Sequence, residues 1–371
     1  MERQKTRTWA EISLSNLEHN VNQMRRQLPE GCSYLGVVKA NAYGHGAVPV
    51  ARKLQDIGVE YLAVASFDEA AELREAGITA QIIILGPSPA WLAKEIAALG
   101  NVVQAVGSLY LANALSEEIG DGTLPVHLKL DTGMSRTGFS VHMPQGMKDA
   151  EAAMQLKGLD VQGVFTHFAV SDEPESSFTH QQFERFMAAV EHLEALRGAR
   201  FPIRHCTNSG AMVNFPEMYL DMVRPGLAQY GLYPAGEHGA LELKPVMKLM
   251  TRVASITDHV EGDTVSYGRT YTCDAPHRFA VLPIGYADGL RRSLSGQLEV
   301  LIHGEKAPQR GRICMDMCMV DITHLPHVKV GDKVEIFGDL QSVEDLAAMA
   351  GTIPYELLCA VSPRVPRVYK E

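Results

Sequence analysis

The sequence lacks several features that mark whole classes of protein. No apolar run approaches the ~18 residues that a membrane-spanning helix requires. The polar start, residues 1–5, is not followed by an apolar segment, so we expect no signal peptide. The formal net charge is -10 and no basic stripe is present, which argues against binding to nucleic acid. These absences predict a cytoplasmic protein that binds neither nucleic acid nor membrane.

Cysteine is sparse and scattered. The chain has six cysteines and no CxxC pair, which is typical of reduced thiols in the cytosol. Cys314 and Cys318 lie four positions apart in an apolar segment, and we interpret them as small buried residues rather than as metal ligands. An HExxH motif is also missing. The sequence therefore predicts no metal site.

What the sequence does contain is a regular alternation of apolar strands and helices. Three of the helices begin with capping boxes, Ser15 with Glu18, Ser66 with Glu69 and Thr179 with Gln182. Such alternation predicts a parallel sheet, and eight units predict a (β/α)8 barrel of the TIM type. A doubly wound open sheet is the alternative on pattern alone. The expected strands are residues 34–38, 61–65, 81–85, 102–106, 126–130, 161–166, 203–207 and 222–226.

The texture of the chain changes after about residue 234. Long helices stop, and short strands separated by glycine-containing turns follow. This pattern predicts a mostly-β C-terminal domain. We expect the barrel domain to span residues 1–238, including a short strand at residues 8–13, and the second domain to span residues 239–371.

The chain is organised around the stretch 37–46. An apolar run from Tyr34 to Val38 ends on Lys39, and a small-residue loop with Tyr43 and two glycines follows. In a parallel barrel, the tip of a strand is where active sites are built. A partly desolvated lysine there should have a lowered pKa and could act as a nucleophile or a base. The alternative is a surface lysine at the start of a loop.

Other unusual residues also follow predicted strands. Ser209, at a strand-to-helix junction, suggests a phosphate site, and Gly226 suggests a close backbone approach to a ligand. Taken singly, Ser209 could be a helix cap, His167 a buried hydrogen-bonded histidine and Arg224 a structural ion-pair residue. A lysine, a phosphate cradle and an arginine at one barrel mouth together predict a pyridoxal 5'-phosphate site. The residues expected at that mouth are Lys39, Tyr43, Asp131, Arg136, His167, Ser209 and Arg224.

Residues 38–46 resemble the cofactor-lysine signature of the bacterial alanine racemase family, which is pyridoxal-phosphate-dependent and of fold type III. Further blocks resemble that family in the same order, so the likeness covers essentially the whole chain. They are residues 131–136, 205–209, 224–226, 266–271, 282–289 and 311–316. One departure is the segment 290–292, where the family often has an aromatic residue and a proline before the arginine.

The resemblance implies an activity and an assembly. The activity is racemisation of L-alanine and D-alanine, supplying D-alanine for peptidoglycan. Lys39 would serve one face of the substrate, and Tyr267 from the partner subunit of a homodimer would serve the other. A free tyrosine titrates near ~10, so His167 and nearby arginines would have to lower its pKa. Without the resemblance, Tyr267 reads as an aromatic residue in a turn.

The resemblance also assigns roles to further residues. Arg224 would face the pyridine nitrogen, and because an arginine keeps its proton it would leave that nitrogen unprotonated. Arg136 and Met315 would bind the substrate carboxylate. Lys129, at the position where some relatives carry a carbamylated lysine, would support Arg136 and is a candidate for the same modification, and Asp316 and Tyr286 would support the site from the partner. The expected cofactor-binding residues are Lys39, Tyr43, His167, Asn208, Ser209, Arg224, Gly226, Leu227 and Tyr355.

Two other functions stay open on the sequence. One is a racemase of broader specificity that acts on serine or lysine. The other is a non-catalytic pyridoxal-phosphate-binding protein, although relatives of that kind resemble the barrel alone. The presence of Tyr267 and Met315 in the second domain weighs against it. The preference among small amino acids, the strength of the dimer and the choice between a biosynthetic and a catabolic role are not encoded in these motifs.

Overall fold

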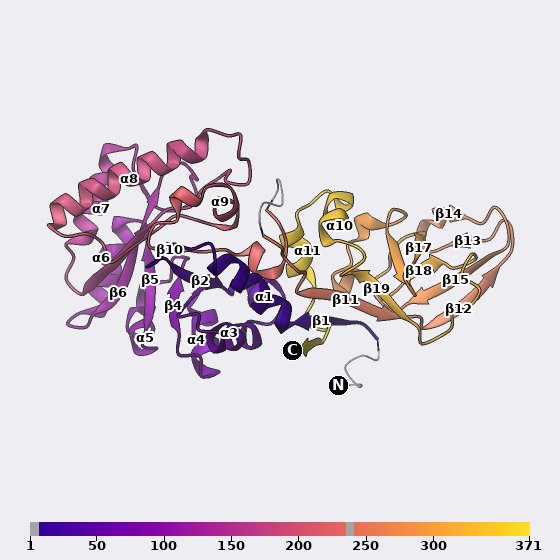
Figure 1. Cartoon of the computed structure of the whole chain (residues 1–371). Helices are drawn as coiled ribbons and strands as arrows, with labels where there is room; N and C mark the ends of the chain where they lie inside the picture. Colours follow the sequence, from indigo (N-terminus) through magenta and orange to yellow (C-terminus); the bar gives the residue numbers. More distant parts are fainter. Residues whose placement is uncertain (1–6, 235–240) are drawn as a thin grey trace. The chain divides into compact units, whose positions relative to one another are not determined.

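The computed structural model describes residues 7–234 and 241–371, which form two compact units (Figure 1). The barrel unit comprises Glu18–Ala42 and Ala47–Leu243. The β unit comprises Met1–Leu17, Tyr43–Gly46 and Lys244–Glu371. The predicted boundary at residue 238 lies outside the described residues and stays a prediction.

Eight parallel strands of the described chain form the wall of the barrel unit. Neighbouring strands around the wall are paired with each other. The two ends of this series, near Arg204 and Asp221, are joined by hydrogen bonds from Asp221 N–H to the Arg204 carbonyl (3.1 Å) and from Arg224 N–H to the Thr207 carbonyl (2.8 Å). The near-closed barrel confirms the predicted fold and all eight predicted strands. In order around the wall they are β10 (Met222–Val223), β2 (Ser33–Val37), β3 (Tyr61–Val64), β4 (Gln81–Ile84), β5 (Val102–Val106), β6 (Leu124–Asp131), β8 (Leu159–Phe165) and β9 (Ile203–His205).

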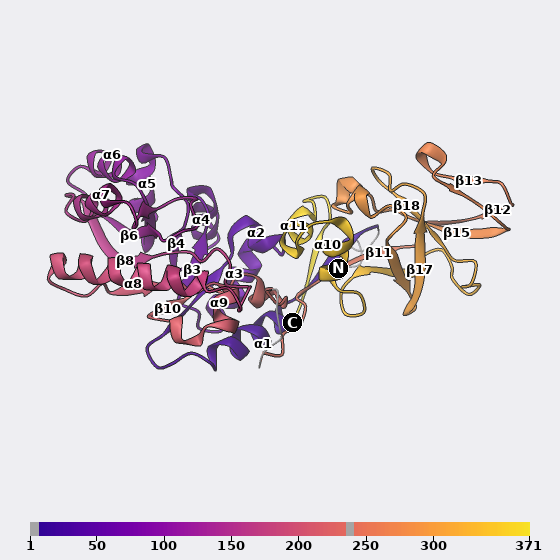
Figure 2. The same cartoon turned by 90° about the horizontal axis from the view of Figure 1, so that it is seen from above.

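Helices follow the strands and lie outside the sheet (Figure 2). Their apolar residues face the strands, as Val50 and Leu54 of α3 illustrate, since both are fully buried. A short strand, β7 (Phe139–Ser140), pairs with the end of β6. The helices are α1 (Leu14–Arg25), α2 (Lys39–Tyr43), α3 (Ala47–Asp56), α4 (Phe67–Glu75), α5 (Ala93–Ala98), α6 (Leu109–Ile119), α7 (Pro144–Met154), α8 (Phe178–Arg197) and α9 (Ser209–Asn214), with 3-10 turns η2 (Ala90–Leu92), η3 (Pro216–Met218) and η4 (Leu227–Tyr230).

The three predicted capping boxes have different outcomes. The box at Ser15 is wrong, because α1 begins at Leu14 and the Ser13 hydroxyl accepts from Asn16 N–H at 3.1 Å. Ser66 caps α4 by accepting a hydrogen bond from Glu69 N–H, as predicted, but the Glu69 side chain bonds elsewhere. The box at Thr179 is wrong, because α8 begins at Phe178, two residues earlier than a cap at Thr179 requires, and Ser177 at the cap position makes no side-chain hydrogen bond. The Gln182 side chain instead accepts from Ala169 N–H at 2.9 Å. It also donates to Thr132 Oγ1 and to the His167 carbonyl, both at 3.2 Å.

The β unit is built on a nine-stranded mixed sheet and a separate hairpin. All its strand pairs are antiparallel except β1 with β20. The predicted mostly-β domain is thus confirmed. The sheet order is β12 (Ser255–His259), β15 (His277–Leu282), β18 (Cys318–Asp321), β17 (Glu305–Arg310), β16 (Glu299–Ile302), β19 (Lys333–Phe337), β11 (Met247–Arg252), β1 (Trp9–Ser13) and β20 (Arg367–Lys370); the hairpin is β13 (Thr264–Val265) and β14 (Tyr271–Thr272). Helices α10 (Val343–Ala350) and α11 (Pro354–Ala360) and 3-10 turns η5 (Tyr267–Arg269), η6 (Tyr286–Asp288) and η7 (Arg292–Leu294) complete this unit.

The strand at the start of the chain belongs to the β unit and not to the barrel domain, where we expected it. β1 pairs antiparallel with β11 and parallel with β20. Trp9 and Ile12 on this strand are fully buried, and Arg252 of β11 lies 5.2 Å from the Trp9 ring. Burial of these large apolar side chains fixes the strand in the second sheet.

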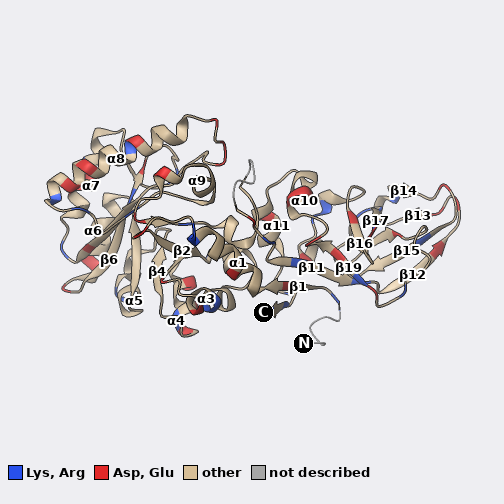
Figure 3. Cartoon of the chain, in the orientation of Figure 1, with Lys and Arg blue, Asp and Glu red and all other residues tan. Residues whose placement is uncertain are grey.

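Basic and acidic residues are interspersed over both units (Figure 3). Among the described residues, none of the helices is long and apolar enough to cross a membrane. The same part of the chain contains no group of three histidine, cysteine or acidic side chains arranged to hold a metal ion.

Candidate active site

Lys39 stands at the C-terminal tip of β2, as predicted, and opens an unusual turn. Ala40, Asn41 and Ala42 have φ of 52–53° and ψ of 47–49°, and Tyr43 has φ 52°. The turn is therefore left-handed, a conformation that costs an L-residue about 1–2 kcal/mol. Ala42 N–H donates to the Val38 carbonyl at 2.8 Å. Strain of this kind persists where surrounding structure enforces it, most often at functional sites.

Four cationic side chains converge at the mouth of the barrel unit. Lys39 follows β2, Lys129 is near the end of β6, Arg136 lies in the loop after β6, and Arg224 follows β10. Burial and the charges of Arg136 and Arg224 lower the pKa of Lys129 to about 8, with a smaller effect from Lys39. Lys129 Nζ donates to Thr137 Oγ1 at 2.5 Å. This concentration of positive charge suits an anionic ligand.

Arg224 is buried and begins a chain of hydrogen bonds through the barrel interior. Its Nη2 donates to the carbonyls of Thr166 (2.9 Å) and Cys206 (3.2 Å). Its Nη1 lies 2.8 Å from Nδ1 of His205, whose Nε2 lies 2.9 Å from Nδ1 of His127. Because a guanidinium can only donate, His205 accepts on Nδ1 and donates from Nε2 to His127.

Both of these histidines are neutral. Burial and the charge of Arg224 lower the pKa of His127 to about 3 and that of His205 well below its ordinary value. Burial lowers the pKa of Arg224 to about 10, so it remains a charged donor at neutral pH. Arg224 is thus held as a permanent hydrogen-bond donor at the barrel mouth.

The loop that carries Arg136 is fixed by Asp131. Oδ1 of Asp131 accepts hydrogen bonds from the N–H groups of Gly133 and Ser135, each at 3.0 Å. Ser135 adopts φ 54°, and Arg185 Nη1 donates to the Thr132 carbonyl at 3.0 Å. Asp131 therefore shapes the loop rather than facing a ligand.

His167 follows β8 at the same mouth. Burial and then the charges of Arg224 and Arg136 lower its pKa well below the ordinary value. We expected His167 to help lower the pKa of a catalytic tyrosine by hydrogen bond and charge. A neutral imidazole can supply the hydrogen bond but not the charge.

The ends of β9 and β10 bring the predicted phosphate residues together. Ser209 Oγ accepts from the N–H groups of Gly226 (2.9 Å) and Ala228 (3.2 Å). The residue that caps α9 is Asn208, whose Oδ1 accepts from Ala211 N–H at 2.9 Å. Ser209 is thus the first residue of the helix, and its hydroxyl joins two loops rather than acting as the cap.

Tyr43 and Tyr355 belong to the β unit, where their ring centroids lie 5.7 Å apart. Tyr43 is buried, and burial followed by the nearby Tyr355 and Cys359 raises its pKa. Gly44 next to it packs so closely that an added Cβ would lie 2.3 Å from the Leu358 carbonyl oxygen. Tyr43 is therefore a neutral phenol that can donate a hydrogen bond.

The residues predicted to act from a partner subunit occupy neighbouring turns of the β unit. Tyr267, in η5 between β13 and β14, is 71% exposed. Ser266 Oγ donates to the Arg312 carbonyl at 2.7 Å, which ties this turn to the one that bears Met315. Tyr286 N–H donates to the Cys314 carbonyl at 3.0 Å. Tyr267, Tyr286 and Met315 are all exposed.

Asp316, which follows Met315, is held in place by arginine side chains. Arg364 Nη2 donates to Asp316 Oδ1 at 2.6 Å, and Arg364 Nε donates to Oδ1 of the buried Asp288 at 2.7 Å. Arg7 donates to the Asp288 carboxylate and to the backbone carbonyl of Asp316. Asp316 therefore stabilises the turn that presents Met315.

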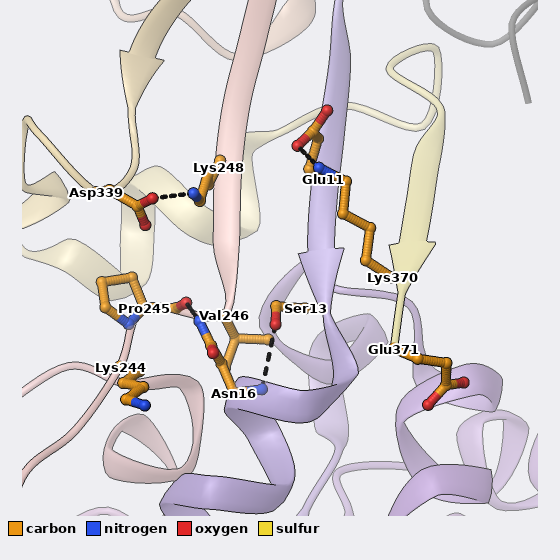
Figure 4. Close-up of a pocket in the computed structure, with 10 residues that line it drawn as sticks. All are labelled: Glu11, Ser13, Asn16, Lys244, Pro245, Val246, Lys248, Asp339, Lys370 and Glu371. Atoms are coloured by element: carbon orange, nitrogen blue, oxygen red, sulfur yellow. Dashed lines mark hydrogen bonds and ion pairs between the residues drawn. The ribbon is translucent and has the colours of Figure 1, made fainter. Parts of the chain in front are cut away.

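A separate cavity of about 420 Å³ lies in the β unit (Figure 4). Most of the residues that line it are polar or charged, and Lys248 pairs with Asp339 and Lys370 pairs with Glu11. Asn16 closes one side by donating to the Pro245 carbonyl at 2.8 Å. It has no counterpart of the charge concentration at the barrel mouth.

Several contributors at the barrel mouth were not predicted from the sequence. His127, His205, Glu69 and Gln182 all make hydrogen bonds there. A signal was available for His127, which interrupts an apolar strand with a polar residue. The contacts of Glu69 with Ala40 and of Gln182 with His167 join distant positions and leave no local pattern.

Comparison with known proteins gives a consistent result over the whole chain. The family description "Alanine racemase, N-terminal domain" matches residues 12–234, and "Alanine racemase, C-terminal domain" matches residues 246–369. The chain is 46% identical to the alanine racemase of Desulforamulus reducens, over 97% of this chain and 98% of that one. It is 44% identical to the alanine racemase of Desulfovibrio desulfuricans, over 98% of each.

Solved structures agree with these sequence matches. The alanine racemase of Clostridium difficile 630 has a TM-score of 0.94 at 39% identity, over 99% of this chain and 96% of that one. The alanine racemase of Bacillus anthracis with bound L-Ala-P has a TM-score of 0.92 at 35% identity, over 99% and 95% of the two chains.

Proposed function

This chain belongs to the alanine racemase family, and from that premise we propose that it interconverts L-alanine and D-alanine by a two-base mechanism. The family depends on pyridoxal 5'-phosphate, so the first question is whether the residues present fit this cofactor. The observation that carries the proposal is the convergence of Lys39, Lys129, Arg136 and Arg224 at one barrel mouth. It provides a lysine for attachment and positive charge for a phosphate and a carboxylate.

The barrel residues fit the cofactor group by group. Lys39, on its left-handed turn, would hold it covalently. Asn208, Ser209, Gly226 and Leu227 lie together at the ends of β9 and β10 and would hold the phosphate, and we assign Tyr43 and Tyr355 as phenol donors to the same group. Arg224 would face the ring nitrogen, and His167 would help to hold the cofactor.

Bound in this way, the cofactor supplies an electron sink that acidifies the Cα hydrogen of an amino acid. Arg224 limits that sink, because a guanidinium held by His205 and two carbonyls donates a hydrogen bond without giving up its proton. A weaker sink favours rapid return of the proton to Cα and disfavours side reactions. The neutral state of His205 and His127 keeps this donor fixed.

Racemisation requires a proton acceptor on each face of Cα. We assign Lys39 to one face and Tyr267, acting on the hydrogen of L-alanine, to the other. Arg136 and the Met315 N–H would hold the substrate carboxylate, and Asp131 keeps the Arg136 loop in shape. His167 is neutral, so it could act on the site through a hydrogen bond but not through charge.

We further propose that Tyr267, Met315, Asp316 and Tyr286 reach the site from a second copy of the chain. The exposure of Tyr267, Tyr286 and Met315 supports this assignment, since large exposed side chains that gather on one surface mark interaction sites. A two-fold dimer would contain two such composite sites. We assign the D-alanine product to peptidoglycan synthesis in the cytoplasm.

The proposal is tested on the purified protein supplied with cofactor. We expect a visible absorbance band that borohydride reduction removes, with the reduced cofactor mapped to Lys39. L-alanine should be racemised far better than L-serine or L-lysine on the same sample. Comparable rates on the three amino acids would favour a broader racemase, and the band without any turnover would favour a cofactor-binding protein. No band would contradict the proposal altogether.

A further inference from the structure

The left-handed turn after Lys39 needs a partner that enforces it. Four successive residues without a glycine, from Ala40 to Tyr43, have positive φ. Within the turn, Ala42 N–H bonds to the Val38 carbonyl, and at its far side Asn41 Oδ1 accepts from Ala47 N–H at 2.8 Å. Neither bond involves the residue that directly follows Lys39.

Glu69 supplies the missing contact. This residue is the third of α4, on the neighbouring β/α unit. Its Oε1 accepts from Ala40 N–H at 2.6 Å, and its Oε2 accepts from Ala65 N–H at 2.6 Å. Ala65 directly follows β3, so one carboxylate joins the backbone beyond the ends of two adjacent strands. Hydrogen bonds to an ionised carboxylate are shorter and stronger than neutral ones.

Only a carboxylate can make this pair of contacts. Each of the two N–H groups needs an acceptor, and Glu69 offers two equivalent oxygens. A glutamine at this position would offer one oxygen and would turn an NH2 group toward the other donor. The start of α4, where Ser66 caps the helix, holds Glu69 in place and also favours its negative charge.

We propose that Glu69 is a positioning residue for Lys39. By accepting from Ala40 and Ala65, its carboxylate keeps the turn left-handed and holds the lysine at the mouth, where its charge acts on Lys129 and His167. This inference rests on the proposed function, since it assumes that Lys39 carries the cofactor. Glu69 itself would touch neither cofactor nor substrate.

The test compares Glu69→Gln with Glu72→Gln, an exposed glutamate on the same helix. In protein freed of cofactor, Glu69→Gln should speed amide hydrogen exchange in the peptide that covers residues 38–43. Its affinity for pyridoxal 5'-phosphate, followed by absorbance, should fall about tenfold, because one of the two backbone N–H groups loses its charged acceptor. For alanine, kcat should fall about tenfold with little change in KM. Glu72→Gln should match the wild type in all three measurements.

A second variant separates positioning from a general loss of stability. Glycine adopts positive φ without a steric penalty, so Ala40→Gly in the Glu69→Gln background should restore part of the cofactor affinity. A defect caused by unfolding of α4 would not be restored. Unchanged exchange and affinity in Glu69→Gln, or no recovery with Ala40→Gly, would overturn the inference. A wild-type protein that fails to bind the cofactor at Lys39 would instead overturn the proposed function.

Discussion

The individual side chains of the barrel mouth combine charged donors with histidines that stay neutral. Arg224 can only donate, and it therefore determines which nitrogen of His205 accepts and which donates. Burial and this charge keep the pKa values of His127, His167 and His205 low. The positive charge at the barrel mouth is thus carried by lysine and arginine side chains. These three histidines do not add to it as the pH passes through the range in which a histidine ordinarily titrates.

Lys129 is the exception, because its pKa of about 8 lies close to neutrality. A neutral amine can add to carbon dioxide with loss of a proton, and the resulting carbamate would face Arg136. We predict that carbamylation of Lys129 rises as the pH is raised from about 7 to about 9, since the neutral fraction increases through its pKa. The measurement is carbon-13 NMR with labelled bicarbonate, and Lys129→Gln is the control. A wild-type spectrum without a carbamate signal over this range would exclude the modification.

Tyr267→Phe tests the assignment of the two faces. Loss of the hydroxyl should reduce racemisation by roughly 10²–10⁴-fold, the usual contribution of a general acid–base group. Lys39 is untouched in this variant, so the α-hydrogen of D-alanine should still exchange with deuterium from the solvent. Proton NMR in heavy water measures both reactions. Tyr110→Phe, at another exposed tyrosine, is the matched control. Racemisation at the wild-type rate in Tyr267→Phe would remove Tyr267 from the mechanism.

The positions of these side chains along the chain could be read from the sequence, but many of their partners could not. Lys39 and Arg224 stand directly after apolar runs, and Arg136 lies in the loop that follows another, which is a local signal. The hydrogen bond between Ala40 and Glu69 joins positions 29 apart, and that between His127 and His205 joins positions 78 apart. Contacts of this kind exist only once the barrel has brought the strands side by side.

Among the helices and strands, the hairpin of β13 and β14 matters most because it carries Tyr267. Val265 and Cys273 pack with Phe279 of β15 in a small apolar cluster. His277 on β15 lies 2.9 Å from Asp321 and 2.8 Å from Asp274, with the Tyr271 hydroxyl 3.5 Å away. The hydrogen bond to Asp274 raises the pKa of His277. The charged imidazole thus links the base of the hairpin to the sheet.

The contacts of His277 predict that the stability of the β unit depends on pH. Because the pKa of His277 is raised in the folded protein, its charged imidazole stabilises the fold fully at a pH below the unfolded pKa of 6.5. This stabilisation is lost as the pH rises through the pKa of the folded protein. His277→Gln should therefore lower the melting temperature of the β unit most at about pH 5.5 and least at about pH 8.5. Circular dichroism melts at the two pH values measure the difference. A difference that stays constant or grows with pH would contradict the linkage.

Close packing around Gly163 in β8 gives a further prediction, which concerns the stability of the barrel. Gly163 has no room for a side chain, since an added Cβ would lie 2.6 Å from Nε2 of the buried His127. Gly163→Ala should destabilise the barrel by about 1–3 kcal/mol, as overpacking of a core usually does. Urea unfolding measures the loss. A variant as stable as the wild type would show that His127 can move aside.

The sequence predicted which segments form strands and helices more often than it predicted which other segments they contact. All eight barrel strands followed from apolar runs bounded by glycine and polar residues. Trp9–Ser13 was also correctly predicted as a strand, but its partners β11 and β20 come from the far end of the chain, so it was assigned to the wrong domain. Gln182 matched a capping pattern, yet its side chain donates to the His167 carbonyl, because α8 begins two residues earlier than the pattern required.

For the molecule as a whole, the proposed active site requires residues of both units of the chain. Lys39, Arg136 and Arg224 belong to the barrel unit, while Tyr267 and Met315 belong to the β unit. The proposed dimer would supply the second set from the other subunit. A site of this kind makes activity depend on assembly, and each subunit contributes one half to each of two sites.

Hybrid dimers test this claim most directly. Subunits with Lys39→Ala and subunits with Tyr267→Phe are produced together with different affinity tags, and only dimers that carry both tags are purified. One of the two sites in such a hybrid would contain both Lys39 and Tyr267, so we predict about half of the wild-type alanine racemase activity, although each parent is inactive. A hybrid as inactive as its parents would mean that both groups act within a single chain, and it would contradict the account.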